Sequence, residues 1–324
     1  LLIPPGTTTC IPHKAPIPEG RGLFFSVSTE PFAENPFSGR SDRSKKEIPE
    51  EGINRSFYKL KQTFQIMIRL TSKAARILYS ILASVIIILF WRNIGFVTAL
   101  FDVPGDSILG LSIKALLLTL VALILTTVVI KPKELFSFLG LSGNILKGFG
   151  IALLCVLPLY LMFPFFGNIN TELTCSVIYD RAILTGFKEE LVFRALMFGL
   201  LFRYAKTGFF WAAILPALYF GSVHLYQGHD VLSALAAFGV TFIGALYFSW
   251  IYVEWNFNLW IPAGLHILMN GAWFVFTMEG TEVAAGGVIS NIARMISIAL
   301  AVVITVYYHK KKGEKVFDYP ILKF

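Results

Sequence analysis

Long apolar segments separated by short polar connections dominate the chain from about residue 77 onward. Each segment is close to the roughly 20 residues that an α-helix needs to cross the hydrocarbon core of a bilayer. The pattern predicts eight membrane-spanning helices, at 77–97, 109–130, 148–166, 182–202, 209–226, 231–253, 258–277 and 285–308. Because the connections are short, we expect an all-α polytopic bundle rather than separate domains.

The N-terminal part of the chain departs from this pattern. Residues 1 to about 54 are polar, rich in Pro and Gly and without hydrophobic period, which is typical of disordered segments. The first methionine in the sequence is Met67. We therefore expect 1–66 to be a disordered extension or leader that is dispensable for function, 67–312 to form the membrane domain, and 313–324 to form a short cytoplasmic tail. An acidic run within the extension argues against the alternative of a cleaved transit peptide.

Composition and charge agree with a membrane protein. Apolar residues make up 56% of the chain and charged residues 15%, whereas soluble domains carry about 25% charged residues. The net charge of +8 arises from Lys and Arg beside the apolar segments, where they contact a membrane surface. We therefore expect membrane lipid and not nucleic acid as a partner. The three scattered cysteines predict neither a disulfide framework nor a metal-binding pair.

The same basic residues predict the orientation in the membrane. They precede the first predicted span and follow the second, fourth and last, whereas Asp and Glu occupy the alternate loops. The positive-inside rule then places both termini in the cytoplasm, which an even number of spans satisfies. We expect a multi-pass protein of a bacterial cell membrane, because the loops are short and the bundle is small.

Three charged residues, Glu189, Glu190 and Arg194, interrupt the segment 182–202. A charge at the centre of a membrane helix costs roughly 2.5–3.5 kcal/mol on insertion scales and marks a functional or paired residue. Positions four apart share a helix face, so Glu190 and Arg194 are expected to form an ion pair that supports the bundle. Glu189 points about 100° away and lacks that cation. A low dielectric disfavours the charged form of such a carboxylate, so that the group takes up a proton more readily. General base catalysis near neutral pH requires this property.

Polar residues also occur in two later segments. His224 follows Phe220 by four positions at the end of the fifth segment, and His266 precedes Asn270 by four positions in the seventh. His266 and Asn270 share a helix face and would present two hydrogen-bond donors toward one point, as an oxyanion site requires. Neither pattern is informative alone, and the value of both comes from their occurrence with the double Glu. We assign no role to His13, His229 or His309.

The motifs EExxxR, FxxxH and HxxxN on three separate predicted helices resemble those of the CAAX protease and bacteriocin-processing family of intramembrane proteases. That family includes the prenyl-protein endopeptidase that removes the last three residues of CaaX proteins. The resemblance covers about residues 75–308 and matches every defining position. It implies that Glu189 activates a water molecule, that His224 helps to hold it, and that His266 and Asn270 stabilise the oxyanion. The positions implied to support the site are Glu190, Arg194 and Phe220.

We expect no cofactor. The sequence lacks HExxH, the usual helix-borne zinc motif, and the architecture of the family is consistent with metal-free hydrolysis of the glutamate type. If a zinc ion were bound, Glu189, His224 and His266 would be its ligands, because carboxylate and imidazole groups are zinc ligands. We favour the metal-free mechanism.

The resemblance implies an intramembrane endopeptidase that cleaves a membrane-embedded or lipidated, CaaX-like peptide inside a cavity of the bundle. Two other classes of function stay open. A non-catalytic scaffold or immunity protein would have the same fold, but would have little need of an unpaired Glu189. A proton-coupled transporter also carries buried Glu, His and Arg residues, although the halves of this chain show no inverted repeat. The sequence does not decide which membrane face the cavity opens to.

Overall fold

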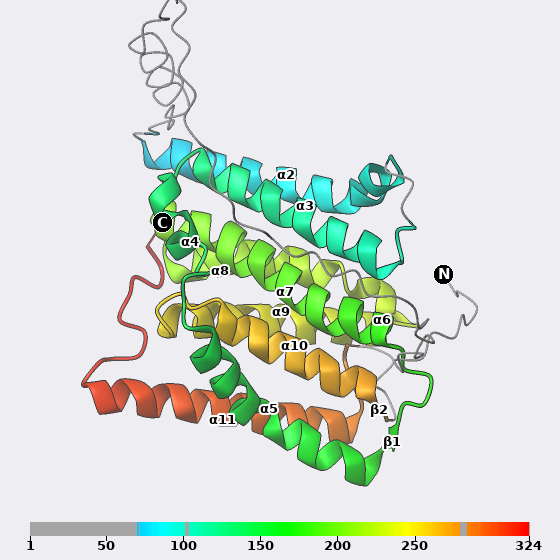
Figure 1. Cartoon of the computed structure of the whole chain (residues 1–324). Helices are drawn as coiled ribbons and strands as arrows, with labels where there is room; N and C mark the ends of the chain where they lie inside the picture. The colour runs from blue at the N-terminus through cyan, green and yellow to red at the C-terminus, as the bar shows by residue number, and fades with distance from the viewer. Residues whose placement is uncertain (1–69, 71, 101–103, 279–283, 324) are drawn as a thin grey trace, which may run out of the picture. The chain divides into compact units, whose positions relative to one another are not determined.

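The computed structural model describes residues 70, 72–100, 104–278 and 284–323. The extension expected at 1–66 lies outside the described residues. Helices make up most of the described part, which also contains one pair of two-residue strands (Figure 1). The predicted all-α class is therefore confirmed.

The helices and strands follow in chain order. The first half of the described chain contains α2 (Lys73–Ala99), α3 (Ile108–Thr127), the 3₁₀ turn η1 (Pro132–Glu134), α4 (Leu135–Phe138), α5 (Ile145–Phe166) and β1 (Asn168–Ile169). A long helical run then comprises α6 (Cys175–Val177), the π-helix η2 (Ile178–Leu184), α7 (Thr185–Glu189), and the π-helices η3 (Glu190–Phe198) and η4 (Leu200–Tyr204). The last part contains α8 (Phe209–Ser222), the 3₁₀ turn η5 (Leu225–Gln227), α9 (Val231–Glu254), α10 (Trp260–Val275), β2 (Phe276–Thr277) and α11 (Val288–Lys312).

Within the described residues, six segments are long and apolar enough to cross a membrane: α2, α3, α5, α9, α11 and the stretch from α8 to η5. They correspond to six of the eight predicted spans. The predicted span 182–202 lies in the helical run α6–η4, where α-helical and π-helical turns alternate. The predicted span 258–277 contains α10, which has 16 residues because the chain leaves the helix at Phe276 and pairs as β2 with β1.

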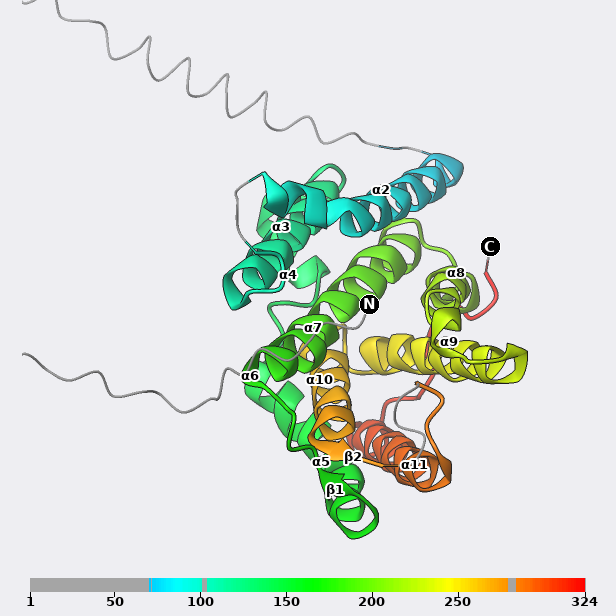
Figure 2. The ribbon, with the colours of Figure 1, turned by 90° about the vertical axis from the view of Figure 1, so that its right-hand side faces the viewer.

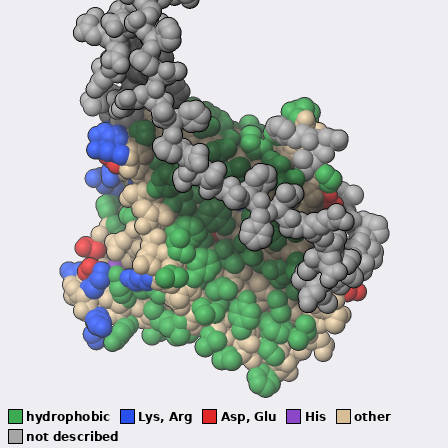
Figure 3. Space-filling view, in the orientation of Figure 1, with side chains coloured by type: hydrophobic (Ala, Val, Ile, Leu, Met, Phe, Trp, Pro, Cys, Tyr) green, Lys and Arg blue, Asp and Glu red, His purple; other side chains and the backbone are tan. Residues whose placement is uncertain are grey.

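The outer surface of the bundle is apolar. In the most apolar 18 residues of each of the six segments, only 17% to 33% are buried. Large side chains such as Phe96, Leu146 and Phe165 are exposed. Contiguous apolar surface of this extent is not compatible with water and contacts lipid in a bilayer. Figure 3 shows this surface, with Lys and Arg side chains gathered on the side where α2 begins and α11 ends. The protein is a multi-pass integral membrane protein.

Close backbone contacts hold α10 at the centre of the bundle. Figure 2 shows α10 between α7 and α5, and it packs against both. A Cβ atom on Gly186 of α7 would lie 2.9 Å from the backbone nitrogen of Ile267, and one on Gly264 would lie 2.8 Å from the Cβ of Ala152 on α5. Small residues allow this approach, as in other membrane helix pairs. The consequence is that the double Glu on α7 and η3 lies against His266 on α10.

The described residues of the predicted tail, 313–323, pack back onto the bundle. The carbonyl groups of Pro320 and Ile321 accept hydrogen bonds from the backbone N–H groups of Phe209 and Phe210, at 2.9 and 3.0 Å. These N–H groups begin α8 and have no partner within that helix. The tail therefore caps α8.

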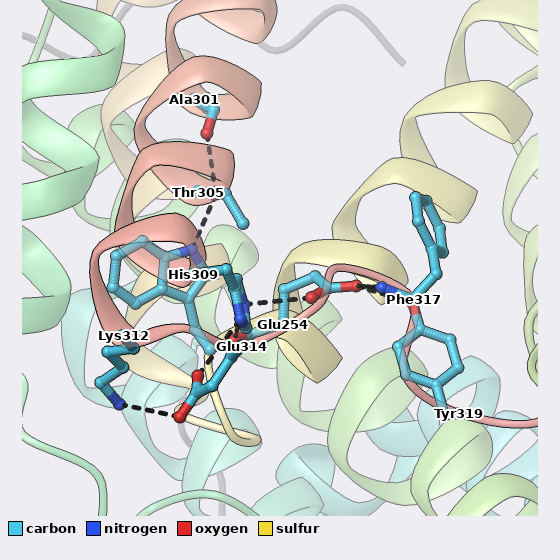
Figure 4. Close-up of polar contacts among 9 residues, drawn as sticks. Glu254, Ala301, Thr305, His309, Lys312, Glu314, Phe317 and Tyr319 are labelled. Atoms are coloured by element: carbon cyan, nitrogen blue, oxygen red, sulfur yellow. Dashed lines mark hydrogen bonds and ion pairs between the residues drawn. The ribbon is translucent and has the colours of Figure 1, made fainter.

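A buried carboxylate anchors the same tail (Figure 4). Glu254, at the end of α9, is 4% exposed and accepts hydrogen bonds from the Phe317 N–H at 3.1 Å and the Tyr319 hydroxyl at 3.0 Å. Burial and then the Glu254 charge raise the pKa of Tyr319, so the hydroxyl stays protonated and donates. His309 on α11 lies 3.1 Å from Glu254 Oε2 and 3.3 Å from Glu314 Oε2. These contacts join α9, α11 and the tail.

Candidate functional site

The ion pair predicted from the EExxxR spacing is present. Arg194 Nη1 lies 3.0 Å from Glu190 Oε1, and the two side chains are 1% and 0% exposed. Both residues belong to η3, a nine-residue π-helix. π-helical turns are rare and occur frequently at functional sites. The pair lies inside the bundle rather than at its lipid-facing surface.

His266 of α10 contacts both carboxylates of the double Glu. Its Nδ1 atom lies 2.7 Å from Glu190 Oε1, and its Nε2 atom lies 3.5 Å from Glu189 Oε2. A carboxylate only accepts hydrogen bonds, so the Nδ1–H group of His266 donates to Glu190. This hydrogen bond determines the tautomer of the neutral ring. The ring is thereby held with Nε2 toward Glu189. The sequence did not predict this contact of Glu190 with His266.

Two aromatic rings cover the guanidinium group of Arg194. Its Cζ atom lies 5.1 Å from the ring centre of Phe220 and 5.2 Å from that of Phe248. Desolvated contacts of this kind contribute about 2 kcal/mol each. The ring centre of Phe248 is also 5.6 Å from that of His266. Phe220 therefore packs against the site as the resemblance implied, whereas no motif in the sequence indicated Phe248.

His224 lies between α8 and η5, and one of its ring nitrogens already has a hydrogen-bond partner. Its Nδ1 atom is 2.7 Å from the carbonyl oxygen of Phe220, and a carbonyl accepts, so Nδ1–H is the donor. The Nε2 atom is then the acceptor of the neutral ring. The rings of Phe220 and His224 have their centres 4.7 Å apart. The FxxxH spacing thus reflects a direct contact that sets the orientation of His224.

Asn270 lies one turn after His266 on α10. Its Nδ2 atom donates to the carbonyl oxygen of Arg181 at 3.1 Å, which connects α10 with η2. The predicted pairing of two free donors, from His266 and Asn270, is therefore not formed in this conformation: Nδ1 of His266 binds Glu190 and the Asn270 amide binds Arg181. Both side chains nevertheless line the same cavity.

A cavity of about 380 Å³ lies among α8, α9, α10 and α11. Its size is within the range of about 300–1,000 Å³ found for ligand pockets. Four predicted site residues line it, namely Phe220, His224, His266 and Asn270. Most of the remaining wall is apolar, formed by Val240, Ile243, Phe248, Met269, Met295, Ile298 and their neighbours. Glu189 is not part of this wall and reaches the site through His266.

One charged residue of the cavity was not singled out from the sequence. Arg294 of α11 lines the wall, and its Nη2 atom donates to the carbonyl oxygen of Ala284 at 2.9 Å. Its Cζ atom lies 4.5 Å from the ring centre of Trp273. The available signal was a charge inside the predicted span 285–308, which is the same kind of signal that identified the double Glu.

The alternative zinc ligands are not grouped in this conformation. No group of three or more His, Cys, Asp or Glu side chains in the described part of the chain is arranged to hold a metal ion. The Nδ1 atom of His266 is bound to Glu190, while its Nε2 atom faces Glu189.

Comparisons with known proteins identify the segment that carries the site. Residues 171–272 match the family described as type II CAAX prenyl endopeptidase Rce1-like. The chain is also 33% identical over 103 residues to a protein of Bacillus subtilis (strain 168) described as "Putative membrane peptidase YdiL". That match covers 32% of this chain and 38% of the relative, so the chain spans less than half the length of the curated relative. No solved structure matches the chain significantly.

The matched segment contains every residue of the three motifs, from Glu189 to Asn270. In the structure these residues come from α7, η3, α8 with the turn that follows it, and α10. Residues 171–272 of the chain are therefore similar to the Rce1-like type II CAAX prenyl endopeptidases.

Proposed function

We propose that this protein is an intramembrane endopeptidase that hydrolyses a peptide bond of a membrane-embedded or lipidated, CaaX-like substrate. The observation that carries the proposal is the contact of His266 with both Glu189 and Glu190 at the wall of a largely apolar cavity. An apolar cavity within a lipid-exposed bundle admits an apolar peptide or a lipid-modified side chain more readily than a water-soluble peptide.

In the proposed reaction Glu189 is the general base. Its carboxylate removes a proton from a water molecule, and the water oxygen attacks the carbonyl carbon of the scissile bond. When the tetrahedral intermediate collapses, the C–N bond breaks and Glu189 returns the proton to the leaving amine. His224 accepts a hydrogen bond from the water at Nε2, because its Nδ1–H is held by the Phe220 carbonyl.

The oxyanion is stabilised by donors on α10. Donation from His266 to the oxyanion requires a proton on both ring nitrogens, so that Nε2–H donates to the oxyanion while Nδ1–H stays with Glu190, whose charge Arg194 balances. Asn270 joins the site when its amide leaves the Arg181 carbonyl. We favour this metal-free mechanism, in which the residues present supply the base and the donors.

The test compares the wild type with Glu189→Gln in proteoliposomes. A glutamine has the same shape and no proton-accepting carboxylate, so we expect turnover of a prenylated peptide to fall by about 10²–10⁴-fold, the contribution of a general base. The melting temperature in detergent should stay unchanged. The matched control is Glu172→Gln at an exposed position, which should retain full turnover.

Full turnover by Glu189→Gln would overturn the proposal for this residue. A cellular phenotype that survives the same substitution would instead support a scaffold or immunity protein, because such a role does not depend on hydrolysis. Capture of uncleaved peptides by Glu189→Gln, followed by mass spectrometry, identifies the natural substrate.

A further inference from the structure

Arg294 brings a permanent positive charge to the cavity. The described residues that line the cavity include Arg294 but no Asp or Glu. A guanidinium group is always protonated, and a cation within the membrane is costly unless it is paired or has a function. In the described part of the chain, no carboxylate forms an ion pair with Arg294, whereas Arg194 has Glu190.

The guanidinium group is held in place but not saturated. Nη2 donates to the Ala284 carbonyl and the group stacks on Trp273. The Nη1 atom is buried and has no hydrogen-bond partner among the described residues. A buried donor without a partner is destabilising. A ligand that brings an anionic acceptor to Nη1 removes that cost and balances the charge of Arg294.

The position of Arg294 relates this group to the reacting centre. α11 forms one wall of the cavity. The same cavity is lined by His224, in the turn after α8, and by His266 and Asn270 of α10. Apolar side chains such as Val240, Ile243 and Met295 make up most of the lining. A ligand that fits this wall is apolar along most of its length and anionic at one point.

We propose that Arg294 binds a carboxylate of the peptide substrate and thereby selects which peptides are positioned for cleavage. This inference rests on the proposed peptidase function. Arginine suits the task because its planar donors match the two oxygens of a carboxylate. The carboxylate comes either from the C-terminus of the peptide or from an Asp or Glu side chain near the scissile bond.

The experiment uses three forms of one prenylated peptide: a free C-terminal acid with an internal Glu, the C-terminal amide, and the acid with Gln in place of the Glu. For the wild type, we expect the KM to rise by about 10–100-fold for the form that lacks the recognised carboxylate, as for loss of a hydrogen bond to a charged group. A raised KM for the C-terminal amide identifies the C-terminus as the source of the carboxylate, and a raised KM for the Gln form identifies the Glu side chain. Equal KM values for all three forms would overturn the proposal.

Variants of the arginine separate recognition from folding. Arg294→Ala should raise the KM for the preferred peptide to the level of its neutral form, with kcat retained, and should leave the neutral peptide unaffected. Arg294→Lys keeps the charge and should restore part of the preference. The control is Arg92→Ala, an exposed arginine on α2, which should keep the full preference. An equal loss for charged and neutral peptides in Arg294→Ala would show a structural role and overturn the proposal.

A binding measurement keeps this test separate from the peptidase assay. The dissociation constants of the same three peptides are measured by titration against Glu189→Gln and against Glu189→Gln combined with Arg294→Ala. Preference for the carboxylate form in the first and its loss in the second support the role of Arg294 even if the wild type cleaves none of the peptides. Identical constants for all three peptides in Glu189→Gln contradict it.

Discussion

The Nδ1 atom of His266 lies 2.7 Å from Oε1 of Glu190 although the two residues are on different helices and 76 positions apart. The same carboxylate oxygen also lies 3.0 Å from Nη1 of Arg194. Glu190 therefore links the helical run α6–η4 to α10 through its contact with His266. Glu189, its neighbour in sequence, faces the second nitrogen of the same imidazole. The two glutamates thus act on one histidine from two sides.

Glu190→Gln should destabilise the bundle by about 3–5 kcal/mol. The substitution leaves Arg194 buried without its counter-charge, which is the costly way to break a buried pair. The loss is measured as a lower melting temperature in detergent. Glu189→Gln is the comparison, because Glu189 is not the partner of Arg194, and it should melt close to the wild type. Equal melting temperatures for the two variants would contradict a structural role for Glu190.

Gly186→Ala should push α7 away from α10. Its Cβ would lie 2.9 Å from the backbone nitrogen of Ile267, and overpacking of this kind costs about 1–3 kcal/mol. We expect a lower melting temperature together with reduced turnover, since His266 is adjacent to Ile267. The matched control is Gly239→Ala in α9, where nothing lies within 4 Å of the added atom. If Gly186→Ala behaves as that control does, the close approach is not required.

Asn270→Ala should lower kcat by about 10²–10³-fold, the effect of removing one oxyanion donor. In this conformation the amide instead donates to Arg181, so the residue has a second, structural contact. Measurement of kcat and melting temperature on the same preparation separates the catalytic role of Asn270 from its structural contact with Arg181. A lower melting temperature with unchanged kcat would assign Asn270 to the contact alone.

Tyr319→Phe should loosen the C-terminal tail. The hydroxyl donates to the buried carboxylate of Glu254 at 3.0 Å, and hydrogen bonds to charged groups contribute about 1.5–3 kcal/mol. The effect is measured as faster hydrogen exchange of residues 317–323 and a lower melting temperature. Tyr307→Phe is the control, because Tyr307 is 65% exposed. Unchanged exchange in Tyr319→Phe would show that the tail is held without this contact.

Treatment with a strong zinc chelator should leave peptidase activity unchanged if the reaction is metal-free. The described side chains do not gather three metal ligands, which is the reason for this expectation. Activity is measured before and after chelation, and again after zinc is restored. Loss on chelation with recovery on zinc addition would require a metal-dependent mechanism.

Several features followed from the sequence because their causes are local. A segment of about 20 apolar residues forms a helix in lipid whatever lies beside it, since its backbone groups must be satisfied internally. The Glu190–Arg194 pair and the contact of His224 with Phe220 both join residues four positions apart. The three motifs also indicated which segments carry the candidate site residues.

Only the tertiary structure decided how these helices meet. The contact of His266 with both glutamates, the bond from Asn270 to Arg181, and the place of Arg294 in the cavity wall depend on which helices are neighbours and how each is rotated. Lipid-facing helices of similar composition can pack in many ways, and close contacts such as Gly186 on Ile267 select one of them. The sequence thus determined the spans and the charged residues within them, while packing determined which partner each charge has.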